Sequence, residues 1–266
     1  MLGFLPRPVR LSGGWGLIRT VRATDGSLVR VLQVGGVYQS ATYLDARRME
    51  PVFSYYRAFD HAFSVRPGTR RVLMVGGGGY AWPKHVLDAG PADCTLDVVE
   101  LDPAVTRAAR RWFFLDEAMA GHSGRLRLVE GEGRSYLEGR ALRMAGAEGG
   151  GASLAYDAIV LDAFCGAEPV RALATLEAAR AARACLVPDG VLMANVVSEQ
   201  GGEDVGLLRD VVATWHEAFS HVHVVACEDE PFAEEDNYLV IATDGGWPVS
   251  DAIPYDDDFL GSVLRD

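Results

Sequence analysis

A buried strand that runs directly into four glycines is the feature that most constrains this chain. The segment 71–75, Arg-Val-Leu-Met-Val, is followed by glycine at 76–79, a pattern typical of a parallel strand ending in a turn where the backbone approaches a ligand. The next apolar run ends in Glu100 about twenty residues later, where a carboxylate can accept hydrogen bonds from both ribose hydroxyls. The sequence therefore predicts an adenosine-type ligand. The residues expected to bind it are Gly76, Gly77, Gly78 and Glu100.

The first part of the chain differs in pattern from the rest. Three short β-rich runs between 17 and 43 are separated by turn signals at Asp25-Gly26 and Gly35-Gly36, which predicts a small antiparallel sheet. Apolar residues at helical spacing between 49 and 63 predict one linking helix. We therefore expect a small N-terminal β-sheet domain that includes this helix.

Strand and helix patterns alternate from residue 71 onward, which predicts a doubly wound parallel sheet. Strands are expected at 71–75, 95–100, 125–130, 156–162 and 190–196. The helices expected between these strands include 103–115, 134–145, 169–186 and 203–218. The last two strands, 221–226 and 237–243, have only a loop between them and should form a hairpin. The glycines alone also fit an enzyme that binds a nicotinamide cofactor. A sheet that ends in a C-terminal hairpin, however, is typical of the S-adenosylmethionine-dependent methyltransferase fold. The expected domains are 1–65 and 66–266.

Composition limits the function classes. With 266 residues, 49% of them hydrophobic, the chain can bury a full core. The formal charge of −12 argues against nucleic-acid backbone binding and is compatible with a cationic small substrate. The four cysteines include no C-x-x-C pair, so we expect no metal site, no disulfide framework and a cytoplasmic protein. No apolar run reaches the length of a membrane span, so no membrane partner is expected.

Four segments at the predicted strand ends resemble, in their order and spacing, the spermidine/spermine synthase family of polyamine aminopropyltransferases. They are Gly76-Gly-Gly-Gly-Tyr80, Val99-Glu-Leu-Asp-Pro103, Val129-Glu-Gly-Glu-Gly-Arg134 and Tyr156-Asp-Ala-Ile-Val-Leu-Asp-Ala-Phe164. The runs 36–40 and 53–56 are similar to the small sheet and the entrance of the same family. The resemblance covers most of the chain. It implies a Rossmann-like catalytic domain, a divergent spermidine synthase-like activity and a homodimer.

The resemblance also implies a role for each matched side chain. Glu132 lies where the family places a carboxylate that accepts from the adenine amino group. Asp162 takes the position of the residue that deprotonates the attacking amine, whose ordinary pKa of about 10 keeps it protonated at neutral pH. Gln39 and Tyr55 resemble positions beside the tail of the sulfonium ligand, and Tyr55 and Tyr56 are expected to bind substrate. Each of these residues also has a simpler interpretation. Glu132 is then a loop residue and Asp162 a helix cap. Gln39 is then a polar residue of the sheet surface and Tyr55 a core aromatic residue.

Three polar positions of the family are altered in this chain. Gly79 stands where the family has an acid that recognises the cationic aminopropyl end, and Cys165 replaces the second carboxylate of the D-x-x-D signature. Tyr55-Tyr56-Arg57 stands in place of a Tyr-His-Glu run. The adenosine half is thus matched, and the polyamine half is not. The acidic residues between 228 and 236 could attract a polyamine or form a solvated hairpin.

Three functions remain open at this point. The leading one is an aminopropyltransferase-like enzyme of polyamine biosynthesis, in which a small-molecule amine attacks decarboxylated S-adenosylmethionine and methylthioadenosine leaves. The second is a methyltransferase that uses S-adenosylmethionine itself. The third is a non-catalytic nucleoside-binding module. In the first case Asp162 is the expected catalytic base, and the acceptor amine is not specified by the sequence.

Overall fold

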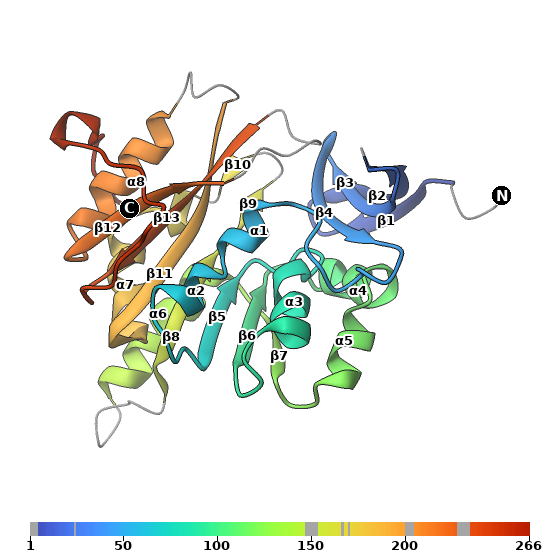
Figure 1. Ribbon diagram of the computed structural model, residues 1–266, viewed down its shortest axis with the longest axis horizontal. Helices are drawn as coiled ribbons and strands as arrows, with labels where there is room; N and C mark the ends of the chain where they lie inside the picture. The colour runs from blue at the N-terminus through green and yellow to red at the C-terminus, as the bar shows by residue number, and fades with distance from the viewer. Residues whose placement is uncertain are drawn as a thin grey trace.

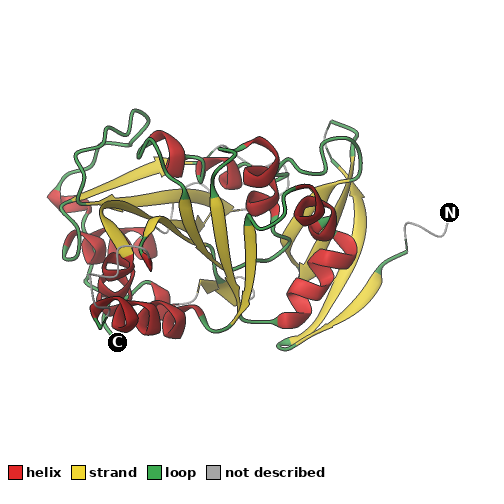
Figure 2. Cartoon of the chain, turned by 90° about the horizontal axis from the view of Figure 1, so that it is seen from below, coloured by secondary structure: helices red, strands yellow, loops and turns green. Residues whose placement is uncertain are grey.

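Two sheets lie side by side along the length of the molecule (Figure 1). The computed structural model describes residues 5–23, 25–146, 154–165, 168–169, 171–199, 205–227 and 235–266. A small antiparallel sheet forms the N-terminal end, and a larger mixed sheet occupies the remainder (Figure 1). Helices pack on both faces of the larger sheet (Figure 2).

The small sheet has one strand more than the sequence predicts. Its strands, in spatial order, are β1 (Arg7–Leu11), β2 (Gly14–Arg22), β3 (Leu28–Val34) and β4 (Val37–Tyr43). The two predicted turns join β2 to β3 and β3 to β4, and Gly26, Gly35 and Gly36 adopt positive φ angles there, as tight hairpins require. β1 is the additional strand, and it forms because its backbone pairs antiparallel with β2 over five residue pairs.

The predicted linking helix is wrong in its extent. The segment contains two short helices, α1 (Tyr55–Ala58) and α2 (His61–Ser64), instead of one helix over 49–63. The N–H groups of Phe59 and Asp60 donate to carbonyls three residues earlier, a tighter pattern that interrupts an α-helix. This turn places Phe59 in the core with no exposed surface.

The larger sheet has the predicted architecture. Its strands are β5 (Arg71–Val75), β6 (Thr95–Glu100), β7 (Leu126–Glu130), β8 (Tyr156–Leu161), β11 (Leu186–Glu199), β12 (His221–Ala226) and β13 (Glu235–Thr243). From edge to edge they run β12-β13-β11-β8-β5-β6-β7. The central pairs are parallel, whereas β13 is antiparallel to both β11 and β12. The doubly wound sheet with a C-terminal hairpin is therefore confirmed.

Helices cover the two faces of this sheet in separate groups. One face carries α3 (Ala81–Ala89), α4 (Pro103–Trp112) and α5 (Leu115–Gly121), and the other carries α6 (Gly133–Ala145), α7 (Leu176–Cys185) and α8 (Gly206–His216). The predicted helix over 103–115 is wrong at its end because Phe114 takes a φ of 60° and separates α4 from α5. None of the helices that the structure describes has the length and hydropathy needed to cross a bilayer.

The helix predicted over 169–186 begins later than expected. The chain after β8 first forms a two-stranded ribbon, β9 (Phe164–Cys165) and β10 (Glu168–Pro169), and a short 3₁₀ turn, η3 (Arg171–Leu173). Thr175 then caps α7 by accepting from the N–H of Ala178. Beyond β13, the chain continues through the 3₁₀ turn η5 (Asp257–Phe259).

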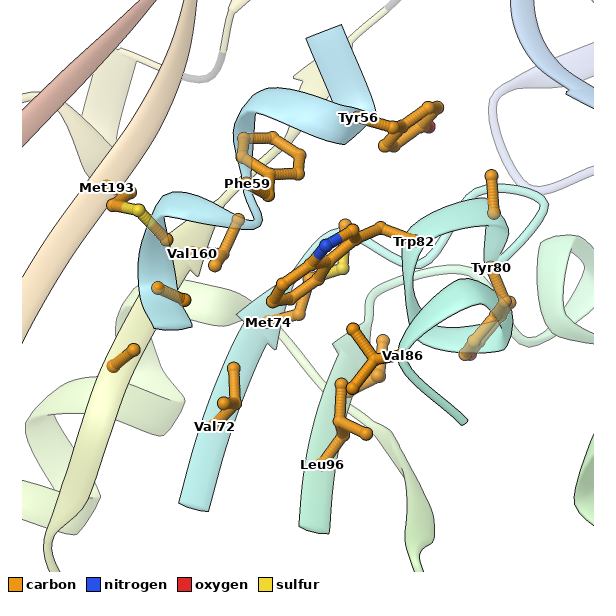
Figure 3. Close-up of a cluster of buried hydrophobic side chains, with 14 of the residues drawn as sticks. Tyr56, Phe59, Val72, Met74, Tyr80, Trp82, Val86, Leu96, Val160 and Met193 are labelled. Atoms are coloured by element: carbon orange, nitrogen blue, oxygen red, sulfur yellow. The ribbon is translucent and has the colours of Figure 1, made fainter. Parts of the chain in front are cut away.

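The core of the larger sheet consists of two apolar clusters, one on each face, and a third small cluster of Ile18, Leu32 and Phe113 packs under the small sheet. Alternate residues of each strand enter opposite clusters, so Met74 belongs to one and Leu73 to the other. Figure 3 shows the first cluster, in which Phe59 and Trp82 lie over the strands. Their rings meet edge to face with centroids 5.7 Å apart, a favourable aromatic arrangement. This cluster fixes α1 and α2 above the sheet, beside the ends of its central strands.

Lys84 of α3 ties the small sheet to the larger domain. It is fully buried, and its ammonium donates to Thr42 Oγ1 and to the carbonyl oxygens of Arg48 and Phe113 at 3.2, 3.1 and 2.7 Å. Burial lowers the pKa of the Lys84 amine to about 7. Because all three N–H bonds have acceptors, the group is satisfied. It joins β4, the loop after β4 and the end of α4.

Candidate active site

The glycine turn after β5 fits between the ends of β6 and β8. Gly76 donates its N–H to the carbonyl of Val99 at 2.9 Å, and Asp162 donates its own N–H to the carbonyl of Val75 at 2.8 Å. Gly76 has a φ of +95°, and a Cβ atom there would lie 2.0 Å from the carbonyl oxygen of Asp162. No side chain fits this position. The turn therefore lies at the switch point of the sheet, where ligands of such folds bind.

The carboxylate of Glu100 lies directly against this turn. Its Oε2 accepts from the N–H groups of Gly77 and Gly78 at 2.8 and 3.2 Å, and its Oε1 accepts from the N–H of Asp102 at 2.9 Å. Each carboxylate oxygen has further lone pairs. The glycine turn and Glu100, which the sequence predicts to bind the same ligand, therefore lie together in the structure. The backbone N–H groups hold the Glu100 carboxylate in a fixed orientation.

β4 of the small sheet forms the neighbouring wall through a bulge at Gln39. Leu32 pairs with Ser40 and Gln33 pairs with Tyr38, which leaves Gln39 as the extra residue of β4. A bulge of this kind changes the direction of a side chain and is common beside functional sites. The carbonyl oxygen of Gln39 lies 3.6 Å from the position of a Cβ on Gly78. Gln39 is therefore adjacent to the glycine turn.

The structure gives a packing reason for Gly79, which the sequence comparison interprets as a lost acid. Its N–H donates to Ser40 Oγ at 2.7 Å. A Cβ on Gly79 would lie 2.9 Å from Ser40 Cβ and 3.1 Å from Phe113 Cδ1, closer than ordinary contacts allow. A side chain at this position would require Ser40 and Phe113 to shift, so glycine suits the close packing of β4 against the turn.

Asp162 follows β8 and faces α1. Its pKa is raised to about 7, first by desolvation and also by the charge of Glu100, while hydrogen bonds from Asn195 and Tyr56 partly offset the rise. Its Oδ1 is buried and has no hydrogen-bond partner among the described residues. A carboxyl group with a raised pKa and one unpaired oxygen is typical of a proton acceptor at a functional site.

Asn195 is a site residue that the sequence predictions missed. β11 pairs in parallel with β8, with Ala194 beside Leu161, so the next residues along the two strands are Asn195 and Asp162. Asn195 is 7% exposed, and its Oδ1 also lacks a hydrogen-bond partner in the described part of the chain. The signal was present, because Asn195 is the one polar residue in the run 191–197, Val-Leu-Met-Ala-Asn-Val-Val.

Tyr55 and Tyr56 of α1 form a pair of aromatic rings beside Asp162. Their ring centroids lie 4.2 Å apart, and Figure 3 shows Tyr56 on α1 above the sheet. The hydroxyl of Tyr56 is hydrogen-bonded to Tyr55 and Asp162, and burial raises the pKa of Tyr56 well above its ordinary value. This hydroxyl lies 3.9 Å from the position of a Cβ on Gly78. The tyrosines therefore connect Asp162 to the glycine turn.

Curated proteins with similar sequences are named polyamine aminopropyltransferases. No family model matches the sequence. A polyamine aminopropyltransferase from Vibrio vulnificus (strain CMCP6) is 31% identical over 160 residues, or 60% of this chain and 48% of that protein. The chain spans about half the length of the curated relatives it matches, or less.

Solved spermidine synthases share the fold over nearly the whole chain. A probable spermidine synthase from Corynebacterium glutamicum ATCC 13032 has a TM-score of 0.69 at 21% identity, covering 93% of this chain and 83% of that one. A spermidine synthase in complex with the transition-state analogue AdoDATO has a TM-score of 0.63 at 21% identity, covering 90% of this chain and 74% of that one. The chain therefore shares the fold of the spermidine synthases and is similar in sequence to polyamine aminopropyltransferases.

Glu132 has a structural role of its own. Its two carboxylate oxygens accept from the N–H groups of Arg134 and Ser135 at 2.8 and 2.7 Å and so cap α6. These bonds lower the pKa of Glu132 against an opposing desolvation. The predicted contact with adenine stays a prediction. Leu101 follows Glu100 directly and is 67% exposed, so it offers an apolar surface beside the end of β6. The sequence predictions did not single out this residue.

Two sequence interpretations lie outside what the structure describes. The side chain of Cys165 and residues 228–234 of the acidic loop are not among the described positions. Among the residues that are described, no group of three or more His, Cys, Asp and Glu side chains is arranged to hold a metal ion. The candidate site comprises the glycine turn, Glu100, Gln39, the two tyrosines, Asp162 and Asn195.

Proposed function

We propose that this chain is a transferase that binds an adenosyl-sulfonium substrate and transfers an aminopropyl group to an amine. One observation supports the proposal most strongly. Two buried oxygens without partners among the described residues, Asp162 Oδ1 and Asn195 Oδ1, lie on adjacent strands beside the glycine turn. Unpaired buried acceptors are costly, and an amine nitrogen supplies the donors that would satisfy them.

The proposed reaction joins the two halves of the site. The glycine turn and Glu100 hold the adenosine portion, with the ribose hydroxyls donating to the carboxylate. The amine nitrogen attacks the methylene carbon beside the sulfonium, and the carbon–sulfur bond breaks with its electron pair going to sulfur, which gives neutral methylthioadenosine. The proton that the nitrogen loses passes to Asp162. Most of the rate enhancement then comes from holding the nitrogen and the carbon in line.

The small sheet closes the site in this scheme. Gln39 at its bulge and Tyr55 contact the tail of the sulfonium substrate in this proposal. Tyr56 donates to the ionised Asp162 and thereby favours the form that accepts a proton. The acceptor is an amine that reaches Asp162 and Asn195 from the tyrosine side.

Aminopropyl transfer is preferred to methyl transfer on two grounds. The relative and the solved structures named above are aminopropyltransferases and spermidine synthases. One of those structures holds a transition-state analogue, AdoDATO. Gly79 packs against Ser40, so the absence of an acid that would repel the carboxylate of S-adenosylmethionine has a packing reason and does not by itself favour methyl transfer.

Calorimetric titration with three nucleosides tests the proposed function directly. We expect decarboxylated S-adenosylmethionine and methylthioadenosine to bind more tightly than S-adenosylmethionine. Incubation of the decarboxylated form with a panel of amines should then release methylthioadenosine. Tighter binding of S-adenosylmethionine with methyl transfer would support the methyltransferase alternative, and binding without any turnover would support a nucleoside-binding module.

Glu100→Gln is expected to weaken methylthioadenosine binding by tenfold or more, because hydrogen bonds to a charged group contribute about 1.5–3 kcal/mol. The melting temperature should fall as well, since the amide would place N–H groups against the backbone donors that Glu100 now accepts from. Glu130→Gln is a matched control, because Glu130 pairs with Glu100 in the sheet and is exposed. Unchanged affinity in Glu100→Gln would contradict the ribose assignment.

A further inference from the structure

One arginine joins three segments beside Glu132, the residue that the sequence resemblance assigns to the adenine, a region referred to below as the nucleobase end of the proposed nucleoside site. Arg134 lies in the first turn of α6, two residues after Glu132, and its side chain is 12% exposed. Its guanidinium donates to the carbonyl of Ala172 at 3.0 Å and to Thr175 Oγ1 at 2.9 Å. It also donates to both carboxylate oxygens of Asp266, at 3.2 and 2.8 Å. A planar guanidinium is suited to such a bidentate contact.

Asp266 is held in place by contacts other than Arg134. It accepts from the hydroxyl of Thr175 at 2.8 Å, and its N–H donates to Glu177 Oε2 at 3.2 Å. The N–H of Leu176 donates to the carbonyl of Leu264 at 2.9 Å. The Thr175 hydroxyl and the Arg134 guanidinium lower the pKa of the Asp266 carboxyl. The segment 264–266 is thus attached to the start of α7 and presents a carboxylate to Arg134.

The segment that Arg134 holds is in contact with the glycine site. A Cβ on Gly133 would lie 2.3 Å from Val75 Cγ1 and 3.7 Å from Leu173 Cδ1. Leu173 of η3 is 6% exposed. Val75 precedes the glycine turn, and Gly133 follows Glu132. Because Gly133 packs between Val75 and Leu173 of η3, a displacement of η3 would shift both the glycine turn and the loop that carries Glu132. The tight packing at Gly133 leaves little room for such a displacement without loss of the site's shape.

We propose that Arg134, oriented by Asp266, is a positioning residue that fixes η3 against the start of α6 and so shapes the nucleobase end of the nucleoside site. Arg134 acts through η3 and the capped end of α6 and does not touch the ligand. The identity of the ligand rests on the proposed function. The attachment of η3 to α6 rests only on the contacts described above.

Two variants that each remove one carboxylate partner of Arg134 test this role. Asp266→Ala breaks the contact that joins α6 to the C-terminal segment. Glu138→Ala is the matched control, because Glu138 accepts from the same guanidinium at 2.6 Å but belongs to α6 itself. Affinity is measured by calorimetry with methylthioadenosine and with methylthioribose, which lacks the nucleobase. Amide hydrogen exchange is measured over 171–176.

In Asp266→Ala we expect methylthioadenosine to bind about tenfold more weakly, the effect of losing a charge-assisted contact, and exchange over 171–176 to become faster. Binding of methylthioribose should change much less, which a general loss of structure would not produce. Glu138→Ala should behave like the wild type. Equal effects of the two variants, or no effect of Asp266→Ala on exchange, would overturn the proposal. If the wild type bound neither ligand, the proposed function and the nucleobase assignment would fail, while faster exchange in Asp266→Ala would still support the attachment of η3.

Discussion

Replacing Asp162 by asparagine is expected to lower kcat for amine alkylation by about 10²–10⁴-fold, the usual contribution of a general base. The amide keeps the shape of the side chain but cannot accept the proton from the amine. Affinity for methylthioadenosine should be nearly unchanged, because the glycine turn and Glu100 are intact. In the wild type, kcat/KM should rise with pH as the carboxyl group, with its pKa of about 7, ionises. The variant should lose this dependence, and wild-type turnover in the variant would reduce Asp162 to a structural residue.

The same substitution should make the protein more stable at neutral and higher pH. The folded-state pKa of about 7 lies above the ordinary value of 3.8, so between these values the folded protein holds a proton that the unfolded chain releases. The free energy of unfolding therefore falls as pH rises through this interval. The amide side chain introduced by Asp162→Asn does not titrate, so the variant avoids a loss of a few kcal/mol, at about 1.4 kcal/mol per pKa unit. Urea denaturation at pH 4 and pH 8 would detect the difference, which should be confined to the higher pH.

Gly76→Ala is expected to cause the largest loss of stability, at least about 3 kcal/mol, from a strained backbone and overpacking together. The new Cβ would lie 2.0 Å from the carbonyl oxygen of Asp162, at a residue whose φ is +95°. Neither the turn nor β8 can move freely, because both are hydrogen-bonded in the centre of the sheet. Since domains are stable by only about 5–15 kcal/mol, the variant should melt far below the wild type.

A nearby glycine provides the control for this prediction. Gly131 lies at the same edge of the sheet, and the nearest atom to a Cβ there would be Val99 Cγ1 at 4.0 Å. Gly131→Ala should therefore keep nearly the wild-type melting temperature. Similar melting temperatures for the two variants would show that the glycine turn is less constrained than its geometry indicates.

The fold could be predicted from the sequence because its signals are local. The apolar strand that enters the glycines and the two final strands without a helix between them each depend on adjacent residues. The boundaries that were wrong depend on single backbone angles or bond patterns. Phe114 ends a helical pattern by adopting a positive φ, and the tighter turn at Phe59 divides the linking segment into two helices. Neither the positive φ of Phe114 nor the tighter turn at Phe59 is indicated by a glycine or proline at that position in the sequence.

The site was less predictable because its properties arise from contacts between distant segments. The pKa of Asp162 is raised by burial and by the charge of Glu100, and hydrogen bonds from Asn195 and Tyr56 partly offset the rise. Tyr56 lies more than 100 residues from Asp162 in the sequence, and Asn195 lies about 30 residues away. The attachment of Arg134 to Asp266 spans 132 residues. Gly79 resembled a lost acid in the sequence, and only its contact with Ser40 of the small sheet explains it. Three-dimensional proximity of this kind leaves no trace in local spacing.

The enclosure of Lys84 has a chemical consequence for a protein proposed to handle an alkylating substrate. Lys84 is the only lysine in the sequence, and its nitrogen is surrounded by Thr42, Arg48 and Phe113. Every other basic side chain, apart from histidine, is an arginine, whose guanidinium stays protonated and is a poor nucleophile. An electrophilic sulfonium released near the surface would meet no lysine amine. Burial of Lys84 therefore shields the one lysine amine of the sequence from alkylation by such a substrate.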